Sequence, residues 1–242
     1  MSATETFNIR PAAPLLSRFF YALIALALLS IVLSIAGKMI GRALSLGGHT
    51  DSVESYEIVI GNNVMALPAN AIRFRNQRHN GVAKRVELYL RWPDMRGYSG
   101  STKNDFNGLN AGRRLLFVAI EEQSMSRDMS GRYLPIYSTM VEEPGKPGPD
   151  GLTIHRFKPG TAYAGEDLIV ANRGANAMPF VARCLDEDVS KAISTACQRD
   201  VHFGDGLQLI YRFPRELIGE WQAIDTAIGT FASNHLKSDP RH

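Results

Sequence analysis

The chain is poor in several features that mark common classes of protein. Its charges nearly balance, with 27 Lys and Arg against 24 Asp and Glu, so the formal net charge is only +3. A nucleic-acid-binding domain normally carries a large basic excess, and we therefore expect no nucleic-acid partner. The composition is also unlike that of a disordered protein, since 45% of the residues are hydrophobic and 21% are charged. Most of the 242 residues are expected to fold.

Sequence motifs of catalysis and cofactor binding are missing. The chain has neither the phosphate-cradling G-x-x-x-x-G-K nor the dinucleotide-binding G-x-G-x-x-G, and its six histidines show no H-E-x-x-H spacing. Gly97-Tyr-Ser-Gly100 is one residue too short for the G-x-S-x-G turn of a serine nucleophile. These absences predict no cofactor, no metal ligands and no catalytic residues, and they favour a protein that is not an enzyme.

Two segments keep an envelope hydrolase open as the alternative. Residues 94–113 form the longest irregular stretch and are rich in Gly, Asn and Ser. The run Asp200-Val-His-Phe-Gly-Asp205 places one imidazole between two carboxylates, which could form an acid–base pair if a turn brought them together. On a strand, however, Asp200 and His202 would share a face and hydrogen bond at the surface.

Cysteine is scarce, with Cys184 and Cys197 the only two. Oxidation would close a loop of about 14 residues and stabilise the fold by roughly 3 kcal/mol. We predict this disulfide, which requires an oxidising compartment. Two buried free thiols are the main alternative, and redox activity or a metal site with His202 is a third.

One long hydrophobic run stands out against this background. The nineteen residues 19–37, FFYALIALALLSIVLSIAG, carry no charge, and as a helix they would rise about 28 Å, close to the thickness of a bilayer core. Arg18 and Lys38 flank the run, and the helical pattern continues to Leu44. We predict a transmembrane helix over 19–44 that acts as an uncleaved signal anchor. A signal peptide cut after Ala36 is the alternative, although the run is longer than a typical signal sequence.

The flanking charges hardly determine the orientation of this helix in the membrane, because the two sides carry the same number of basic residues. Arg10 and Arg18 precede the run, and Lys38 and Arg42 follow it. We predict a cytoplasmic tail over residues 1–18, a single span in the bacterial inner membrane and a periplasmic C-terminal domain, in agreement with the disulfide. Small residues at helical spacing predict a helix–helix contact, such as a homodimer, through Ala27, Ser30, Ser34, Gly37 and Gly41.

Beyond a small, polar linker over 45–55, the hydrophobic pattern changes from helical to alternating. The clearest alternation places Val86, Leu88, Leu90 and Trp92 on one face of a strand. Further strands are expected at 56–60, 64–67, 115–121, 133–141, 152–157, 167–171, 180–185 and 207–213. The chain closes with an amphipathic helix in which Leu217, Trp221, Ile224, Ile228 and Phe231 form the apolar stripe. Residues 56–242 are thus predicted to form an α+β domain, mainly antiparallel β with a C-terminal helix.

Basic residues gather in one segment of this domain without an acidic residue between them. The cluster is a candidate contact with anionic head groups, envelope polymers or an acidic partner, although an ordinary solvated hairpin explains it as well. Its members are Arg73, Arg75, Arg78, Lys84 and Arg85.

Three runs, together with the early span, carry a resemblance to a group of known proteins. They are Val86-Glu-Leu-Tyr-Leu-Arg-Trp-Pro-Asp94, Arg127-Asp-Met-Ser-Gly-Arg-Tyr133 and Cys197-Gln-Arg-Asp followed by Tyr211-Arg-Phe-Pro and Trp221. Over most of its length the chain resembles uncharacterised single-pass membrane-anchored proteins of Gram-negative bacteria. The resemblance implies an envelope location and no particular chemistry. The predicted function is a membrane-anchored, non-catalytic domain that binds or scaffolds another envelope component, a protein or a polymer.

Overall fold

The computed structural model describes residues 14–46, 48–107, 112–175, 177–191 and 193–237, without the side chains of 14–17 and 38–46. The first thirteen residues of the predicted tail lie outside this description. The chain divides into two compact units, residues 1–47 and 48–242. Each unit is described separately below.

The first unit is one long helix, α1 (Pro14–Leu46). Its most apolar window, Arg18–Gly37, has a mean hydropathy of 2.6, and none of that window is buried within the chain. Twenty helical residues rise about 30 Å, which matches the hydrocarbon core of a bilayer. By length and composition, α1 can therefore cross a membrane.

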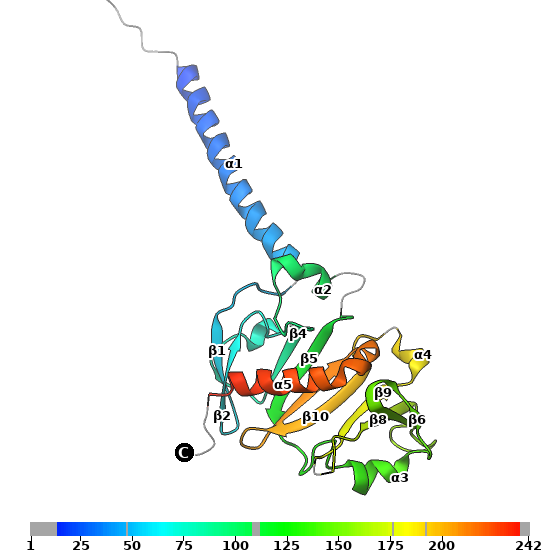
Figure 1. Ribbon diagram of the computed structural model, residues 1–242. Helices are drawn as coiled ribbons and strands as arrows, with labels where there is room; N and C mark the ends of the chain where they lie inside the picture. The colour runs from blue at the N-terminus through cyan, green and yellow to red at the C-terminus, as the bar shows by residue number, and fades with distance from the viewer. Residues whose placement is uncertain (1–13, 47, 108–111, 176, 192, 238–242) are drawn as a thin grey trace, which may run out of the picture. The chain divides into compact units, whose positions relative to one another are not determined.

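The second unit contains a small and a large β-sheet (Figure 1). The small sheet has the order β2-β1-β3, and the large one β4-β5-β11-β10-β9-β8-β7-β6. Every neighbouring pair is antiparallel except β1 with β3. The strands are β1 (Ser55–Ile60), β2 (Asn63–Pro68), β3 (Gly81–Val82), β4 (Arg85–Arg91), β5 (Leu115–Glu122), β6 (Lys146–Pro147), β7 (Leu152–Arg156), β8 (Glu166–Ala171), β9 (Phe180–Leu185), β10 (Cys197–Phe203) and β11 (Leu207–Phe213).

Short helical turns connect these strands. They are η1 (Arg75–Gln77), η2 (Gly100–Thr102), α2 (Lys103–Asn107), η3 (Tyr133–Tyr137), α3 (Ser138–Met140), η4 (Pro149–Gly151), α4 (Glu187–Ser190) and η5 (Arg215–Glu220). The last helix, α5 (Trp221–His235), lies across one face of the large sheet (Figure 1). Its apolar stripe, which begins at Leu217 in η5, is buried in the main core as predicted. The α+β fold class is therefore confirmed.

The alternation in β4 is also confirmed, with one addition. Val86, Leu88, Leu90 and Trp92 are buried on the face that packs into the main core. Tyr89, which the pattern assigns to the solvent face, is buried as well. A cluster of aromatic rings, including His49 and Phe106, covers it from the other side. Because these rings come from distant parts of the sequence, the alternating pattern within the strand could not predict that Tyr89 is buried.

One predicted strand is wrong. Residues 133–140 form the π-turn η3 followed by α3 instead, and Val141 makes an isolated antiparallel bridge with Phe157. Tyr137 and Val141 are buried four residues apart, which is a helical spacing, and Pro135 has no N–H to donate to a sheet ladder. This segment covers the second face of the large sheet at β7–β9. A second core forms there from Met129, Tyr137, Val141, Phe157, Leu168, Val170 and Val181.

The predicted disulfide is present and lies at a short junction between two strands in the middle of the large sheet. Cys184 in β9 and Cys197 in β10 are directly opposite each other and are bonded. These two strands pair at only one further position, Gln198 with Arg183. The disulfide therefore links the two halves of the sheet, β4-β5-β11-β10 and β9-β8-β7-β6, at a junction where the strands pair at only two positions.

Candidate functional site

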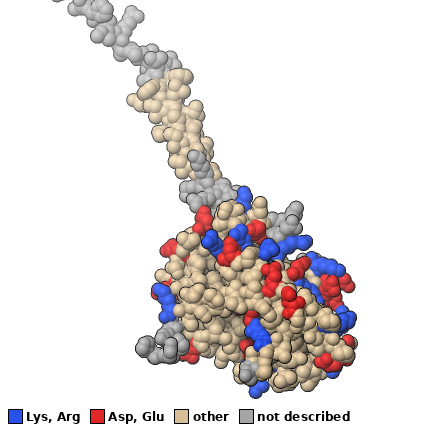
Figure 2. All heavy atoms as spheres, viewed as in Figure 1, with Lys and Arg blue, Asp and Glu red and all other residues tan. Residues whose placement is uncertain are grey.

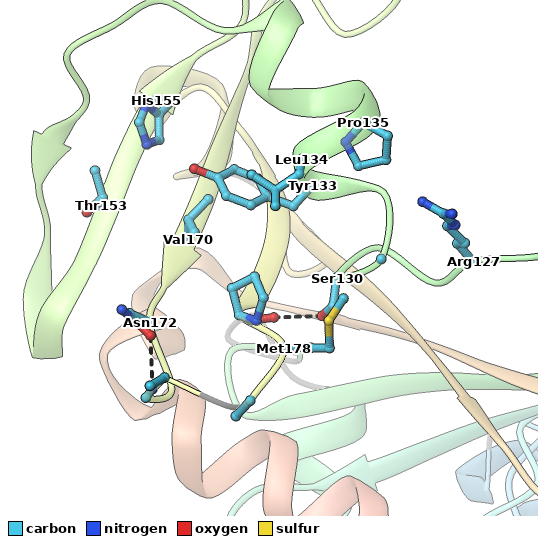
Figure 3. A pocket seen from close by; sticks show the side chains of 15 residues that line it. Arg127, Ser130, Tyr133, Leu134, Pro135, Thr153, His155, Val170, Asn172 and Met178 are labelled. Atoms are coloured by element: carbon cyan, nitrogen blue, oxygen red, sulfur yellow. Dashed lines mark hydrogen bonds between the residues drawn. The ribbon is translucent and has the colours of Figure 1, made fainter.

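A pocket of about 620 Å³ opens on the face of β7 and β8 that is turned away from α5 (Figure 3). We call it the η3 pocket, because the η3 segment forms one of its walls. Its lining comes from β7–β8 (Thr153, His155 and Val170), from the segment around η3 (Arg127, Ser130, Gly131, Tyr133, Leu134 and Pro135) and from the β8–β9 loop (Asn172, Gly174, Ala175, Ala177, Met178 and Pro179). The volume falls in the ordinary range of ligand and anchor pockets.

The strand wall of the pocket follows from sheet geometry. Thr153 and His155 are two residues apart on β7 and so point to the same face. Val170 on β8 is directly opposite Thr153. Their sequence neighbours Leu152 and Ile169 point to the other face and belong to the main core. The pairing of β7 with β8 and the packing of the opposite face in the main core therefore hold this wall in place.

Hydrogen bonds fix the floor. Ser130 Oγ donates to the carbonyl oxygen of Pro179 at 2.7 Å, and Asn172 Oδ1 accepts from the Gly174 N–H at 2.9 Å (Figure 3). Ser130 Oγ also accepts a hydrogen bond from Nη1 of Arg199 at 2.9 Å. Because these bonds join the two loops to each other and to β10, the pocket is largely preformed.

The η3 wall is apolar and exposed. Leu134 is 75% exposed and Ile136 41% exposed, while Met178 across the opening is 59% exposed. Tyr133 lies between this wall and the strands, with its hydroxyl pointing toward the His155 side (Figure 3). Single π-turns are rare and occur often at functional sites, and exposed apolar side chains that cluster at a pocket mark binding surfaces.

The residues that line the pocket include basic side chains and no acidic one. The basic ones are Arg127 and His155. Within the described residues, the Arg127 guanidinium makes no ion pair or hydrogen bond, whereas Nδ1 of His155 lies 3.4 Å from Glu143 Oε1 outside the lining. Burial, reinforced by the charge of Glu143, raises the pKa of Tyr133. Its phenol therefore stays neutral and can donate a hydrogen bond.

A buried polar network lies behind the floor and was not predicted from the sequence. Arg199 is 3% exposed and donates to Asp225 Oδ1 at 2.9 Å and to the Val181 carbonyl oxygen at 2.8 Å. The Tyr211 hydroxyl donates to the same Asp225 oxygen at 2.6 Å. Through Arg199, the network joins helix α5 to β9, β10 and Ser130 in the pocket floor.

The charges in this network are compensated. Burial opposes ionisation of Asp225, but Arg199 and Arg173 outweigh it and hold the pKa of this carboxyl below its ordinary value. Arg173 pairs with the second carboxylate oxygen of Asp225 and stacks over the Trp221 ring. The network therefore has the character of a structural support.

Neither a family of related sequences nor an individual characterised protein matches the chain by sequence. Two solved structures are similar to it. One is an immunity protein of the Stenotrophomonas maltophilia type IV secretion system. It has 16% identity and a TM-score of 0.55, and the match covers 80% of this chain and 98% of that one. This likeness shows the fold alone.

The second similar structure is the iron-regulated outer membrane lipoprotein FrpD of Neisseria meningitidis. It has 14% identity and a TM-score of 0.44, with 77% of this chain and 96% of that chain covered. Both neighbours come from Gram-negative bacteria.

The residues of the alternative hydrolase do not converge. Asp200 pairs with Arg132 at 2.5 Å, and Ser99 Oγ lies within hydrogen-bond distance of the hydroxyls of Ser101 and Thr102. The buried Nε2 of His202 has no hydrogen-bond partner among the described residues. Within those residues, no group of three or more His, Cys, Asp or Glu side chains could hold a metal ion. Ser99 lines a separate pocket of about 500 Å³ together with Arg91 and Arg96, but no histidine belongs to that lining, so the described residues form no Ser–His pair there.

The predicted basic cluster is partly used inside the fold. Arg78 donates to the carbonyl oxygens of Ile72, Arg73 and Gly48. Arg85 pairs with two carboxylates, Glu87 and Glu121, and Arg73 stacks over the Phe74 and Phe117 rings. Arg75 and Lys84 are exposed. Figure 2 shows Lys and Arg interspersed with Asp and Glu on the face in view. Contact of the cluster with an anionic surface stays a prediction.

The predicted helix–helix contact also stays a prediction. Within α1, Ser30 Oγ donates to the carbonyl oxygen of Leu26 in its own helix. A Cβ added at Gly37 would meet nothing within 4 Å, so this position leaves room for a neighbouring helix. Ala27 and Ser34 are exposed, whereas the surroundings of Gly41 lie outside the description.

Proposed function

We propose that the chain is a membrane-anchored, non-catalytic binding protein of the bacterial envelope. In this proposal α1 is an uncleaved span of the inner membrane, the N-terminus is cytoplasmic, and the domain from Gly48 onward lies in the periplasm. There the domain binds another envelope protein through the η3 pocket. The observation that carries the proposal is the pocket itself, a preformed hollow whose lining includes the exposed apolar side chains of Leu134 and Met178.

Two further observations support the proposal. Disulfides persist in oxidising compartments such as the periplasm, and Cys184–Cys197 joins the halves of the large sheet. The similar fold of an immunity protein suggests that the bound protein is a toxin that this chain neutralises. This last step is an analogy from fold, because 16% identity carries no function by itself.

The anchor gives such a binding protein a physical advantage. Confining the domain to a thin layer beside the membrane raises the effective concentration of any partner that is itself at the membrane. The domain can then hold its partner without a high intrinsic affinity. A soluble form of the domain should accordingly capture less of the same partner.

The test is photocrosslinking in intact cells. A photoreactive residue replaces Leu134 in the full-length chain, and a matched control replaces Val82, which is 81% exposed on β3. We expect a discrete adduct with one envelope protein at position 134 and none at position 82. Equal patterns at the two positions, or no adduct at 134, would contradict the proposal. Expressing the domain without residues 1–44 behind a cleavable signal should reduce the yield of the adduct.

A further inference from the structure

The chemistry of the η3 pocket indicates which part of a partner it accepts. This inference rests on the proposed function, because it specifies the segment that would occupy the pocket. We propose that the pocket binds a peptide segment in which a bulky apolar side chain stands next to a carboxylate, with the apolar group between Tyr133 and Met178 and the carboxylate on Arg127.

The apolar part of the proposal follows from the walls. Leu134, Pro135, Val170 and Met178 contribute aliphatic surface to the lining, and Tyr133 adds an aromatic ring. Leu134 and Met178 are more than half exposed, so an apolar side chain that enters would remove both from water. Burying such surface stabilises a complex by roughly 25 cal/mol per Å² of apolar area. Met178 is flexible and polarisable, which lets it adapt to an aromatic or an aliphatic anchor.

The acidic part follows from the charge of the lining. Arg127 makes no ion pair or hydrogen bond among the described residues, and the lining holds no carboxylate. In the absence of a partner this guanidinium is therefore available, and a cationic partner would be repelled. A carboxylate can accept two parallel hydrogen bonds from a guanidinium, which makes the pairing both strong and directional.

Polar groups in the lining favour a peptide over a fatty acid, which also combines an apolar chain with a carboxylate. Thr153, Asn172 and the Tyr133 hydroxyl lie around the pocket (Figure 3). In the described residues, neither the Tyr133 nor the Thr153 hydroxyl makes a hydrogen bond. Peptide N–H and C=O groups can pair with these side chains, whereas an acyl chain would bury them without hydrogen-bond partners, which is unfavourable.

The experiment is a selection from a random seven-residue peptide display library on the full-length protein in lipid nanodiscs. Three proteins are compared: wild type, Arg127→Glu, and Arg212→Glu as a control at an exposed arginine on β11, outside the η3 pocket. We expect wild type and Arg212→Glu to select an aromatic or large aliphatic residue beside Asp or Glu. Arg127→Glu should select a basic residue in place of the acidic one.

The binding affinity of a synthetic peptide with the selected sequence is then measured for each of the three proteins. Loss of a charge-assisted hydrogen bond predicts roughly ten- to a hundredfold weaker binding to Arg127→Glu, with no change for Arg212→Glu. The inference is overturned if no peptide is enriched, if the selected sequences lack an acidic residue, if Arg127→Glu selects the same sequences, or if palmitate binds and peptides do not. If any of these results is obtained but the photocrosslink at Leu134 still forms, the inference about the peptide is wrong, whereas the proposed function is still supported.

Discussion

At the scale of single residues, the contacts of His49 predict how the stability of the domain depends on pH. Its Nδ1 lies 2.8 Å from the Tyr89 hydroxyl, its Nε2 lies 2.9 Å from Asn107 Oδ1, and its ring stacks on Tyr98. Because the amide oxygen can only accept, Nε2 carries the proton, and Nδ1 accepts from Tyr89. A neutral imidazole satisfies both contacts. Burial lowers the pKa of His49, and nearby Arg78 and Arg73 act in the same direction.

This geometry predicts that acid destabilises the domain through His49. Since the folded pKa is below the unfolded value of about 6.5, the stabilisation is present above pH 6.5 and is lost as the pH falls through the folded pKa. We expect the free energy of unfolding to fall from pH 7 to pH 5 by more in wild type than in His49→Gln. Denaturant titrations followed by tryptophan fluorescence measure this, because both tryptophans, Trp92 and Trp221, lie in the domain. Equal pH dependence in the two proteins would show that the imidazole is not held neutral.

A second prediction at this scale concerns Asp225, which Arg199, Arg173 and Tyr211 all contact. Asp225→Asn leaves the buried Arg199 charge without its carboxylate, which typically costs about 3–5 kcal/mol. Asp188→Asn is the matched control, because the pair of Asp188 with Lys191 is largely exposed and worth at most about 1 kcal/mol. The same denaturant titration compares the two variants. Similar losses in both would mean that the buried network is not a structural support.

At the scale of elements, the sequence predicted what local periodicity determines. The stripe of α5 and the alternation of β4 were predicted correctly, because each buries one face against the main core. The expected strand at 133–141 was wrong, since its run of apolar residues fits a buried strand and a helical turn equally well.

The candidate site was missed because it is built from three distant segments. Residues 152–157 and 167–171 were predicted as strands, but residues 133–141, which form the facing wall, were wrongly predicted as a strand as well. Local patterns carry no information on which turns meet across a sheet. The one available signal was the apolar run Leu134-Pro-Ile136. In the structure these three residues are exposed and do not belong to a core.

The disulfide gives a prediction for the junction of β9 and β10. Replacing both Cys184 and Cys197 with Ala removes the covalent link between two strands that pair at only two positions. The loop-entropy model gives a loss of roughly 3 kcal/mol for a loop of this length. Denaturant titration of the double variant measures the loss, and wild type treated with a reductant should show a similar one. Unchanged stability in both would indicate that side-chain packing alone holds the halves together.

At the scale of the whole molecule, the chain combines an apolar helix with a domain that carries a preformed pocket. The helix was predictable from composition alone, because a run of nineteen predominantly apolar residues without a charge is typical of a helix that can span a membrane. The side of the membrane on which the domain lies was not, since the flanking charges are nearly symmetric. The proposed periplasmic location therefore depends on the disulfide and on the resemblance to membrane-anchored proteins, and this location would determine which partners the pocket can meet.

The most direct test of the account is the topology of the full-length chain in cells, with an epitope at the C-terminus. Cells are fractionated, and spheroplasts are treated with proteinase K before and after lysis. The account predicts an intact 26.7 kDa chain in the membrane fraction, with the epitope digested in unlysed spheroplasts. An epitope that is protected until lysis, or a soluble chain that lacks about the first 36 residues, would contradict it.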